Sequence, residues 1–295
     1  MTSPGSALRR VSRRTLALGV VTLATLLIAS GSSAFTFTTI DVPGALFTTA
    51  QGIKGGKIVG WYEDTARRLH GLLFKKIGKI VTIDVPGATG TVVGGTNGKT
   101  FVGTYDDSQG FVHGFTFTGG VYTQIDVPFP NSAGTQVHGI NKAGQIVGSY
   151  NDGSGTHAFL TEANGTFVSF DATGPNTFDT EAFGVNDAGQ IVGWSVDNNG
   201  YHGFLRQPDG TITLLNAPGF DATQAFGINK AGLIVGVVLS FQTGTHGFVR
   251  DTGGAYTPID PPGATVTQAY GISKGGIIVG GFSDLNGTHG FRAGP

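Results

Sequence analysis

Short apolar runs separated by turn-forming residues recur along most of the chain. Between residues 136 and 171 the runs are QVHGIN, QIVGSY, HAFLT and TFVSFD, and Gly, Asn or Asp bounds each of them. Short runs rich in Val, Ile, Thr and Phe predict β-strands. The segments Asn141-Lys142-Ala143-Gly144 and Glu162-Ala163-Asn164-Gly165 are typical of tight hairpins. The pattern therefore predicts a unit of four short antiparallel strands.

One turn sequence marks six copies of this unit. The copies of the turn begin at Asp41, Asp84, Asp126, Asp171, Asn216 and Asp260, with spacings of 43, 42, 45, 45 and 44 residues. Four of these turns contain Pro followed by Gly. That pair suits the centre of a type II turn, because Pro presets φ and Gly accepts a positive φ. Four strands in about 40 to 45 residues is the size of a β-propeller blade.

The two ends of the repeated region complement each other. Residues 35–41 (FTFTTID) have the sequence of a fourth strand without the preceding three, whereas the chain closes with three strands, QAYGIS, IIVGGF and THGFR, that lack a fourth. Pairing them would cover two exposed sheet edges. We therefore predict an all-β fold: a six-bladed β-propeller of four-stranded antiparallel blades, closed by pairing the N-terminal strand with the C-terminal three strands. Its repeat units span about residues 35–76, 77–120, 121–165, 166–210, 211–254 and 255–295.

Glycine makes up 51 of the 295 residues, and much of it stays in register between copies. The expected first strands carry Gly52, Gly95, Gly139, Gly184, Gly227 and Gly271, and the second strands carry Gly60, Gly103, Gly148, Gly193, Gly236 and Gly280. A third column on the third strands is Gly in five copies and Ala158 in the other. Because a missing side chain permits close approach of two backbones, we expect tight packing near the axis of the propeller.

Residues 1–34 are predicted to form a removable signal peptide. Four arginines, at positions 9, 10, 13 and 14, precede an apolar stretch from Thr15 to Ala29 and small residues from Ser30 to Ala34. The apolar stretch is too short to span a bilayer comfortably. The segment Ser12-Arg13-Arg14-Thr15-Leu16 partly resembles a twin-arginine signal, so this route and the general secretory route both stay open. We expect a secreted or periplasmic protein without a membrane span after signal removal.

Charge and cysteine content narrow the class of partner. Without the leader, the chain has 14 basic and 19 acidic residues, a net charge of −5, which argues against nucleic acid as a partner. The sequence contains no Cys, so no disulfide framework or lipid-attachment cysteine exists and packing alone must hold the fold. We expect a monomer; no cofactor is assigned, and Ca²⁺ is the candidate ion.

A short motif opens the third strand of each unit. It reads His157-Ala158-Phe159-Leu160 in one copy and His-Gly-Phe at residues 113–115, 202–204, 246–248 and 289–291. Together with a GIN..G.IVG element, it resembles the HAF family of bacterial extracellular repeat proteins over essentially the whole mature chain. Most copies have Gly where the family tripeptide has Ala, and residues 70–72 read His-Gly-Leu. The resemblance implies export and a propeller-like repeat, and it implies no defined activity.

The histidines of this motif are predicted to be structural. Six of the seven histidines occupy the one repeat position: His70, His113, His157, His202, His246 and His289. With strands about 4.8 Å apart, a third strand lies roughly 15 Å from the axis, and neighbouring histidines are about as far from each other. Zinc ligands must lie about 2 Å from the metal. The histidines therefore share no metal, and we expect each to bond a turn within or beside its own blade.

Most acidic residues fall at one end of the predicted propeller, which we call the upper face. It holds the turns from fourth to first strands, with Asp41, Asp84, Asp126, Asp171 and Asp260, and the turns from second to third strands, with Asp64, Asp107, Asp152, Asp197 and Asp284. Glu63, Asp106, Asp179, Glu181 and Asp221 join them, so this face carries 15 of the 19 acids and a net charge of −13, against +8 on the lower face.

Two interpretations of this asymmetry stay open. Asp commonly begins turns, where its carboxylate bonds the backbone two residues on, and this accounts for many of the ten repeated positions. Turn chemistry does not explain why the basic residues avoid the same end. Carboxylates and turn carbonyls are the oxygen ligands that Ca²⁺ takes, and a field of one sign attracts cations. The ten repeated Asp residues are therefore candidates for a surface that binds Ca²⁺ or a cationic ligand.

Residues that depart from the repeat are candidates for a single site at the channel. The position before the first-strand Gly reads Gln51, Gly94, His138, Phe183, Phe226 and Tyr270 in the six copies. His138 is the only histidine off the repeated column, and with Gln51 and Tyr270 it is a candidate channel residue. No Ser or Cys nucleophile with a matching base is apparent from spacing, so catalytic residues and metal ligands stay unassigned.

Three functions are consistent with these features. The leading one is an exported, non-catalytic binding or scaffold propeller whose acidic upper face recognises a glycan, a peptide or a cation. The first alternative is an extracellular polysaccharide lyase or hydrolase with its site at the channel mouth, and the second is a structural cell-surface protein without a small ligand. A deep upper pocket with two inward carboxylates and His138 would favour the enzyme, whereas a sealed channel with a shallow acidic rim would favour binding.

Overall fold

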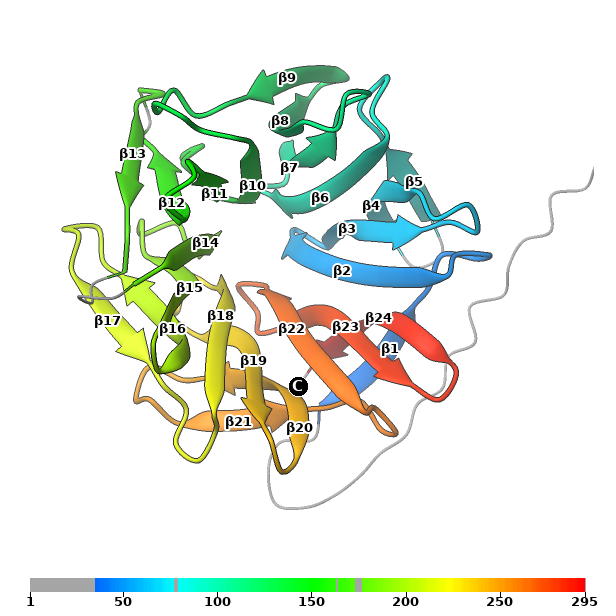
Figure 1. Ribbon diagram of the computed structural model, residues 1–295. Helices are drawn as coiled ribbons and strands as arrows, with labels where there is room; N and C mark the ends of the chain where they lie inside the picture. The colour runs from blue at the N-terminus through cyan, green and yellow to red at the C-terminus, as the bar shows by residue number, and fades with distance from the viewer. Residues whose placement is uncertain (1–34, 77–78, 163, 173–176, 295) are drawn as a thin grey trace, which may run out of the picture.

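The computed structural model describes residues 35–76, 79–162, 164–172 and 177–294. The predicted leader, residues 1–34, lies outside the described residues. The described chain is all-β, with 24 strands and no helix (Figure 1). Within these ranges, no helix has the length and apolar character needed to cross a membrane.

Neighbouring strands pair antiparallel in groups of four, which we call units 1 to 6. Unit 1 contains β2 (Phe47–Lys54), β3 (Lys57–Glu63), β4 (Leu69–Lys76) and β5 (Lys79–Ile83); unit 2 contains β6 (Gly90–Thr96), β7 (Thr100–Asp106), β8 (Val112–Thr118) and β9 (Val121–Ile125). Unit 3 contains β10 (Thr135–Ile140), β11 (Ile146–Asn151), β12 (Thr156–Thr161) and β13 (Phe167–Phe170); unit 4 contains β14 (Asp179–Val185), β15 (Ile191–Asp197), β16 (Gly200–Arg206) and β17 (Ile212–Leu215). Unit 5 contains β18 (Ala222–Ile228), β19 (Ile234–Ser240), β20 (Gly244–Arg250) and β21 (Tyr256–Ile259).

Unit 6 combines both ends of the described chain. Its first three strands are β22 (Val266–Ile272), β23 (Ile278–Asp284) and β24 (Gly287–Gly294), and its fourth is β1 (Thr36–Ile40). Strand β1 runs antiparallel to β24, with Phe37 opposite Ala293 and Ile40 opposite Gly290. The rings of Phe37 and Phe291 also meet edge to face, with centroids 5.9 Å apart. The pairing that the sequence predicts between these two segments is therefore present.

The six units lie around a common centre, with the first strand of each innermost (Figure 1). Each first strand contacts the next: β2 with β6, β6 with β10, β10 with β14, β14 with β18, β18 with β22, and β22 with β2. Strand pairing between units is limited to isolated parallel bridges, such as Phe47 with Thr288, and the strands form open sheets of 12, 8 and 4 members. Side chains also bond the next unit: Nδ2 of Asn141 donates to the carbonyl oxygen of Asn186, and three other units repeat this bond. Side-chain packing and these side-chain hydrogen bonds therefore hold the units together.

Glycine sets the distance between neighbouring first strands. A Cβ atom added to Gly95 would lie 2.8 Å from the carbonyl oxygen of His138 in the next unit, and one added to Gly227 would lie 2.6 Å from that of Tyr270. The relation continues from unit 6 to unit 1, because a Cβ on Gly271 would lie 2.8 Å from the carbonyl oxygen of Gln51. These separations confirm the tight packing near the axis that the first-strand glycine column predicts.

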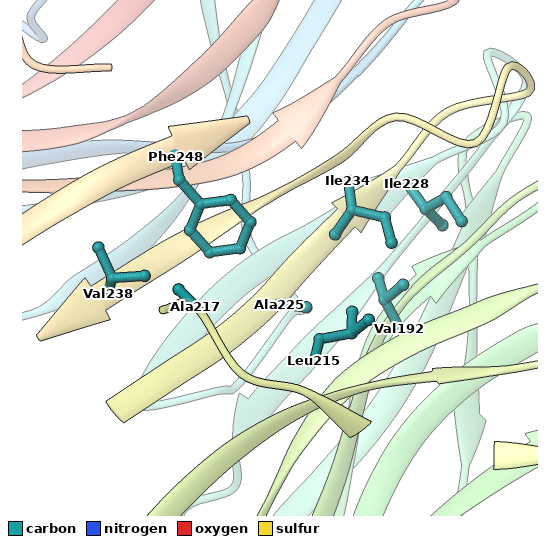
Figure 2. Packing of buried hydrophobic residues seen from close by; sticks show 8 residues of the cluster. All are labelled: Val192, Leu215, Ala217, Ala225, Ile228, Ile234, Val238 and Phe248. Atoms are coloured by element: carbon teal, nitrogen blue, oxygen red, sulfur yellow. The ribbon is translucent and has the colours of Figure 1, made fainter. Parts of the chain in front are cut away.

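The Phe of the third-strand motif fills the core between units. Phe115, Phe159, Phe204, Phe248 and Phe291 are all essentially inaccessible to solvent. Each pairs directly with a second-strand Gly, as Phe248 does with Gly236, and covers the space that the missing side chain leaves. Figure 2 shows Phe248 and Ile234 of unit 5 packed in one cluster with Val192 and Leu215 of unit 4.

We predict that Gly271→Ala destabilises the protein, because the new Cβ must displace the backbone of unit 1. Overpacking of this kind costs about 1–3 kcal/mol, measured as the loss in unfolding free energy in urea. The matched control is Gly275→Ala in the adjacent hairpin, since a Cβ there meets no atom within 4 Å. Equal stability of the two variants would contradict the close approach between units 6 and 1.

Candidate functional site

Each repeated histidine joins two turns of its own unit, an arrangement we call the histidine clamp. In unit 1, Nδ1 of His70 lies 2.8 Å from Asp84, which follows the fourth strand, and Nε2 lies 3.2 Å from Asp64, in the turn between second and third strands. Nδ1 in the other units lies 2.9 Å from Asp126 (His113), 3.0 Å from Asp171 (His157), 2.9 Å from Asn216 (His202), 3.0 Å from Asp260 (His246) and 3.0 Å from Asp41 (His289). The structural role predicted for this column is confirmed.

Electrostatics favours the clamp hydrogen bonds in units 1 and 3. The backbone N–H of Arg68 and the imidazole of His70 lower the pKa of Asp64, although desolvation opposes them. Partial burial disfavours the charged form of His70, but the hydrogen bonds from Asp84 and Asp64 outweigh it and raise the pKa of the imidazole. The same balance raises the pKa of His157. A histidine that bonds two turns through its two ring nitrogens is a compact cross-link between them.

The clamps account for the ten repeated Asp residues predicted as a binding surface. Asp41, Asp84, Asp126, Asp171 and Asp260 contact a histidine Nδ1, and Asp64, Asp107, Asp152, Asp197 and Asp284 face a histidine Nε2 at 2.9–3.6 Å. Four of the six histidines have an Asp on both nitrogens, whereas His202 has Asn216 on Nδ1 and His246 has the carbonyl oxygen of Thr243 on Nε2. Each pair stays within its own unit, so the structure does not gather the ten side chains into one site. In the described part of the chain, no three or more His, Asp or Glu side chains are placed to hold a metal ion.

A cavity of about 500 Å³ lies at the upper end of the axis, and it collects all three predicted channel residues. Gln51, His138 and Tyr270 line it from three different first strands. Gln136 and Gln224 contribute amide groups, and Asp106 contributes a carboxylate at the upper end of β7. A smaller cavity of about 90 Å³ lies further down the axis, between the glycine-rich stretches of the first strands.

An aromatic belt forms one wall of this cavity. The ring of Phe183 stacks on Trp194, with centroids 6.4 Å apart, and meets Phe226 edge to face at 5.0 Å. Phe226 in turn lies 5.0 Å from Tyr270. His138 also stacks on Phe183, with ring centroids 4.3 Å apart. All five rings line the cavity, so units 3 to 6 present a continuous aromatic surface to it.

Glu181 and His138 form a half-buried pair beside this belt. Oε2 of Glu181 lies 3.8 Å from Nε2 of His138, and each side chain is 19% exposed. Burial, with a smaller contribution from the charge of Asp179, raises the pKa of Glu181 to about 7. Burial lowers the pKa of His138 to about 4, and its Nε2 has no hydrogen-bond partner among the described residues. Near neutral pH the imidazole is therefore uncharged and the carboxyl group titrates.

Glu181 belongs to the predicted acidic upper face, and the contact between its side chain and the channel residue His138 was not predicted. A signal for this was present, since Glu181 precedes Phe183 by two positions and side chains two apart share one face of a strand. The same position holds Gln136, Gln224 and Gln268 in three other units. A second row of polar side chains thus lies above the row that contains His138.

Exposed apolar side chains concentrate at the same end of the molecule. Of the nine large apolar side chains that the described residues leave exposed, seven lie in or beside upper-face turns: Leu46, Phe111, Phe178, Tyr201, Phe241, Val266 and Leu285. Phe241 is 85% exposed and Leu285 is 98% exposed. Clustered exposed apolar groups are typical of interaction surfaces. The cavity therefore opens on the end of the molecule that also carries most of this apolar surface.

Comparison with known proteins gives the fold. No protein-family model and no curated protein matches the sequence. Among solved structures, TolB from Acinetobacter baumannii is similar with a TM-score of 0.57 at 11% identity, over 81% of this chain and 63% of TolB. A mutant of Aleuria aurantia lectin in complex with alpha-methyl-L-fucoside has a TM-score of 0.51 at 11% identity, over 87% of this chain and 96% of the lectin. A mutant of AofleA from Arthrobotrys oligospora has a TM-score of 0.51 at 12% identity, over 78% and 80% of the two chains.

These neighbours are β-propeller proteins. At such low identities the likeness shows the fold alone. The predicted all-β, propeller-like architecture is therefore confirmed.

We predict that Asp84→Ala lowers the stability of the protein. The change removes the acceptor of His70 Nδ1 and also the carboxylate oxygen that accepts the backbone N–H of Gly71 at 3.1 Å. Loss of these bonds from partly exposed groups should cost about 1–2 kcal/mol in urea unfolding. An unchanged unfolding free energy would contradict a stabilising role for the clamp.

Proposed function

We propose that the chain is a closed six-bladed β-propeller that acts outside the cytoplasm as a binding protein, with the axial cavity as its ligand site. Three observations support this proposal: the contacts that continue from β22 to β2, the pairing of β1 with β24 and the signal-like sequence of residues 1–34. The resemblance of the third-strand motif to HAF repeats agrees with an exported propeller. Most of the repeated Asp side chains already bond the histidines of the clamps. We therefore place the ligand site in the axial cavity and not on the acidic rim.

The observation that carries this proposal is the composition of the cavity wall. Its volume of about 500 Å³ lies in the range of small-molecule sites, roughly 300–1,000 Å³. The aromatic belt and the amide side chains of Gln51, Gln136 and Gln224 line the same cavity. Aromatic faces pack on the apolar side of a sugar ring, while amides exchange hydrogen bonds with its hydroxyl groups. We therefore propose a glycan as the ligand, with the apolar upper turns available to further sugar units.

We predict that the exported protein binds a subset of glycans on an array, and that Gln136→Leu weakens this binding about tenfold or more. The reason is that a hydroxyl group paired with the amide would lose its partner inside the cavity, at a cost of about 1–3 kcal/mol. The matched control is Gln242→Leu in an exposed turn, which should bind normally. Absence of any glycan binding by the folded protein, or equal loss in both variants, would contradict the proposed site.

The Glu181–His138 pair favours hydrolysis or elimination of a polysaccharide as a second candidate function. A carboxyl group with its pKa raised to about 7, beside an imidazole whose pKa is lowered to about 4, can exchange protons with a substrate near neutral pH. The cavity also holds the carboxylate of Asp106. The upper pocket thus has several of the features that the sequence analysis associated with an enzyme.

We predict that, if this second function holds, reducing ends or unsaturated sugars accumulate when the protein is incubated with a polysaccharide that it binds. With a polysaccharide that carries no ammonium group, Glu181→Gln should then reduce the rate at least a hundredfold while leaving binding within a few-fold, because the amide keeps the shape but cannot transfer the proton. A reducing-sugar assay combined with absorbance of the unsaturated product tests both chemistries. Binding without any product would leave the non-catalytic function.

A further inference from the structure

We infer that the axial cavity receives an organic ammonium group, held between the aromatic belt and the carboxylate of Glu181. This inference rests on the proposed function, since it names the chemistry of one part of the ligand that the same site would take. A glycan with an amino sugar or with a choline substituent would carry such a group.

The charges around the cavity have one sign. Asp106 lines the cavity, Glu181 lies 3.8 Å from the lining residue His138, and Asp179 is close enough to Glu181 to affect its ionisation. No Lys or Arg is among the residues that line the cavity. A cation that enters this space therefore meets acidic groups without a competing base. A cationic partner stabilises a partly buried carboxylate, because burial by itself disfavours the charged form of the carboxyl group.

The aromatic belt supplies the second half of a cation site. Three successive units contribute aromatic rings to the cavity wall, namely those of Trp194, Phe183, Phe226 and Tyr270. Aromatic faces attract ammonium groups through the ring quadrupole, most strongly in a desolvated site, and aromatic walls are the usual recognition element for quaternary ammonium ligands. Glycans without charge need no acidic group at this point, so the belt and Glu181 together favour a cation.

His138 adds a polar group that no described residue satisfies. Its Nε2 is buried and is 3.8 Å from Glu181, which is too long for a hydrogen bond, and the residue is one of those that line the cavity. Because burial keeps this imidazole neutral, it adds no positive charge that would repel an ammonium ligand.

The pH dependence of binding follows from the groups that face Glu181. These are His138 on β10 and Asp179 on β14, with Asp106 on the far part of the cavity. A carboxyl group with a pKa of about 7 is about one-tenth ionised at pH 6 and about nine-tenths ionised at pH 8. His138, with a pKa of about 4, stays neutral over this range. A permanent cation should therefore bind about tenfold more tightly at pH 8 than at pH 6.

The test compares choline with 3,3-dimethyl-1-butanol, which has the same shape without the charge. Binding to the exported protein is followed by calorimetry and by the fluorescence of Trp194 in a Trp61→Phe background, since the chain has only two Trp residues. We expect choline to bind at least tenfold more tightly than its neutral analogue, and this preference to fall at pH 6. Glu181→Gln should remove the preference and the pH dependence, whereas Glu162→Gln, in a hairpin at the lower end, should change neither.

The outcomes separate this inference from the proposed function. If the two probes bind equally at pH 8, or if Glu181→Gln keeps the preference for choline, the ammonium site is wrong. Glycan binding on the array that is lost with Gln136→Leu would then still support the axial site. If choline binds as expected and no glycan does, the cation site stands and the glycan proposal fails. Unfolding curves of each variant show whether a loss of binding reflects loss of the fold.

Discussion

The close approach of neighbouring first strands is the constraint on which the rest of the structure depends. In every unit, a glycine of the first strand leaves room for a backbone carbonyl of the next unit, as Gly95 does for His138 and Gly271 for Gln51. Together with side-chain hydrogen bonds between units, such as that from Nδ2 of Asn141 to the carbonyl oxygen of Asn186, this packing decides how near the units come to the axis. It also decides how wide the axial cavity is, because the carbonyls that occupy the glycine sites belong to the residues that line it.

The third-strand motif combines three physical tasks in three consecutive residues. Its histidine clamps two turns, its Gly or Ala allows the next unit to approach, and its Phe covers the second-strand glycine. A threonine on each first strand complements the clamp, since Thr223 accepts the backbone N–H of Ala217 at 2.9 Å and four other units repeat this bond. In unit 6 the donor position is Pro261, which has no N–H, and the hydroxyl of Thr267 accordingly has no partner among the described residues.

The candidate site lies where the repeat is broken. Unit 2 has Gly94 at the register position of Gln51, His138 and Tyr270. It has Val92 at the position of Gln136 and Glu181. Unit 2 therefore leaves space in the cavity that the other units fill with rings and amides. Beside it, units 3 and 4 supply the His138–Glu181 pair, in which burial shifts the ionisation of both members strongly. Equal units give a symmetric ring with a uniform channel, whereas unequal units give a pocket with a charged wall and an aromatic wall.

The sequence by itself determined the strand pattern, the six-fold repeat, the pairing of residues 36–40 with the C-terminal strand and the local role of the repeated histidines. Each of these depends on residue types at fixed spacing, and the separation of His157 from the turn at Asp171 is set by the hairpin between them. It also identified Gln51, His138 and Tyr270 as channel residues, because they stand at one register position. Only the tertiary structure decided that Glu181 meets His138, that the aromatic belt is continuous and that the ten repeated Asp residues serve separate clamps. Those facts depend on distances between units, and such distances arise from packing around the axis, which no single repeat encodes.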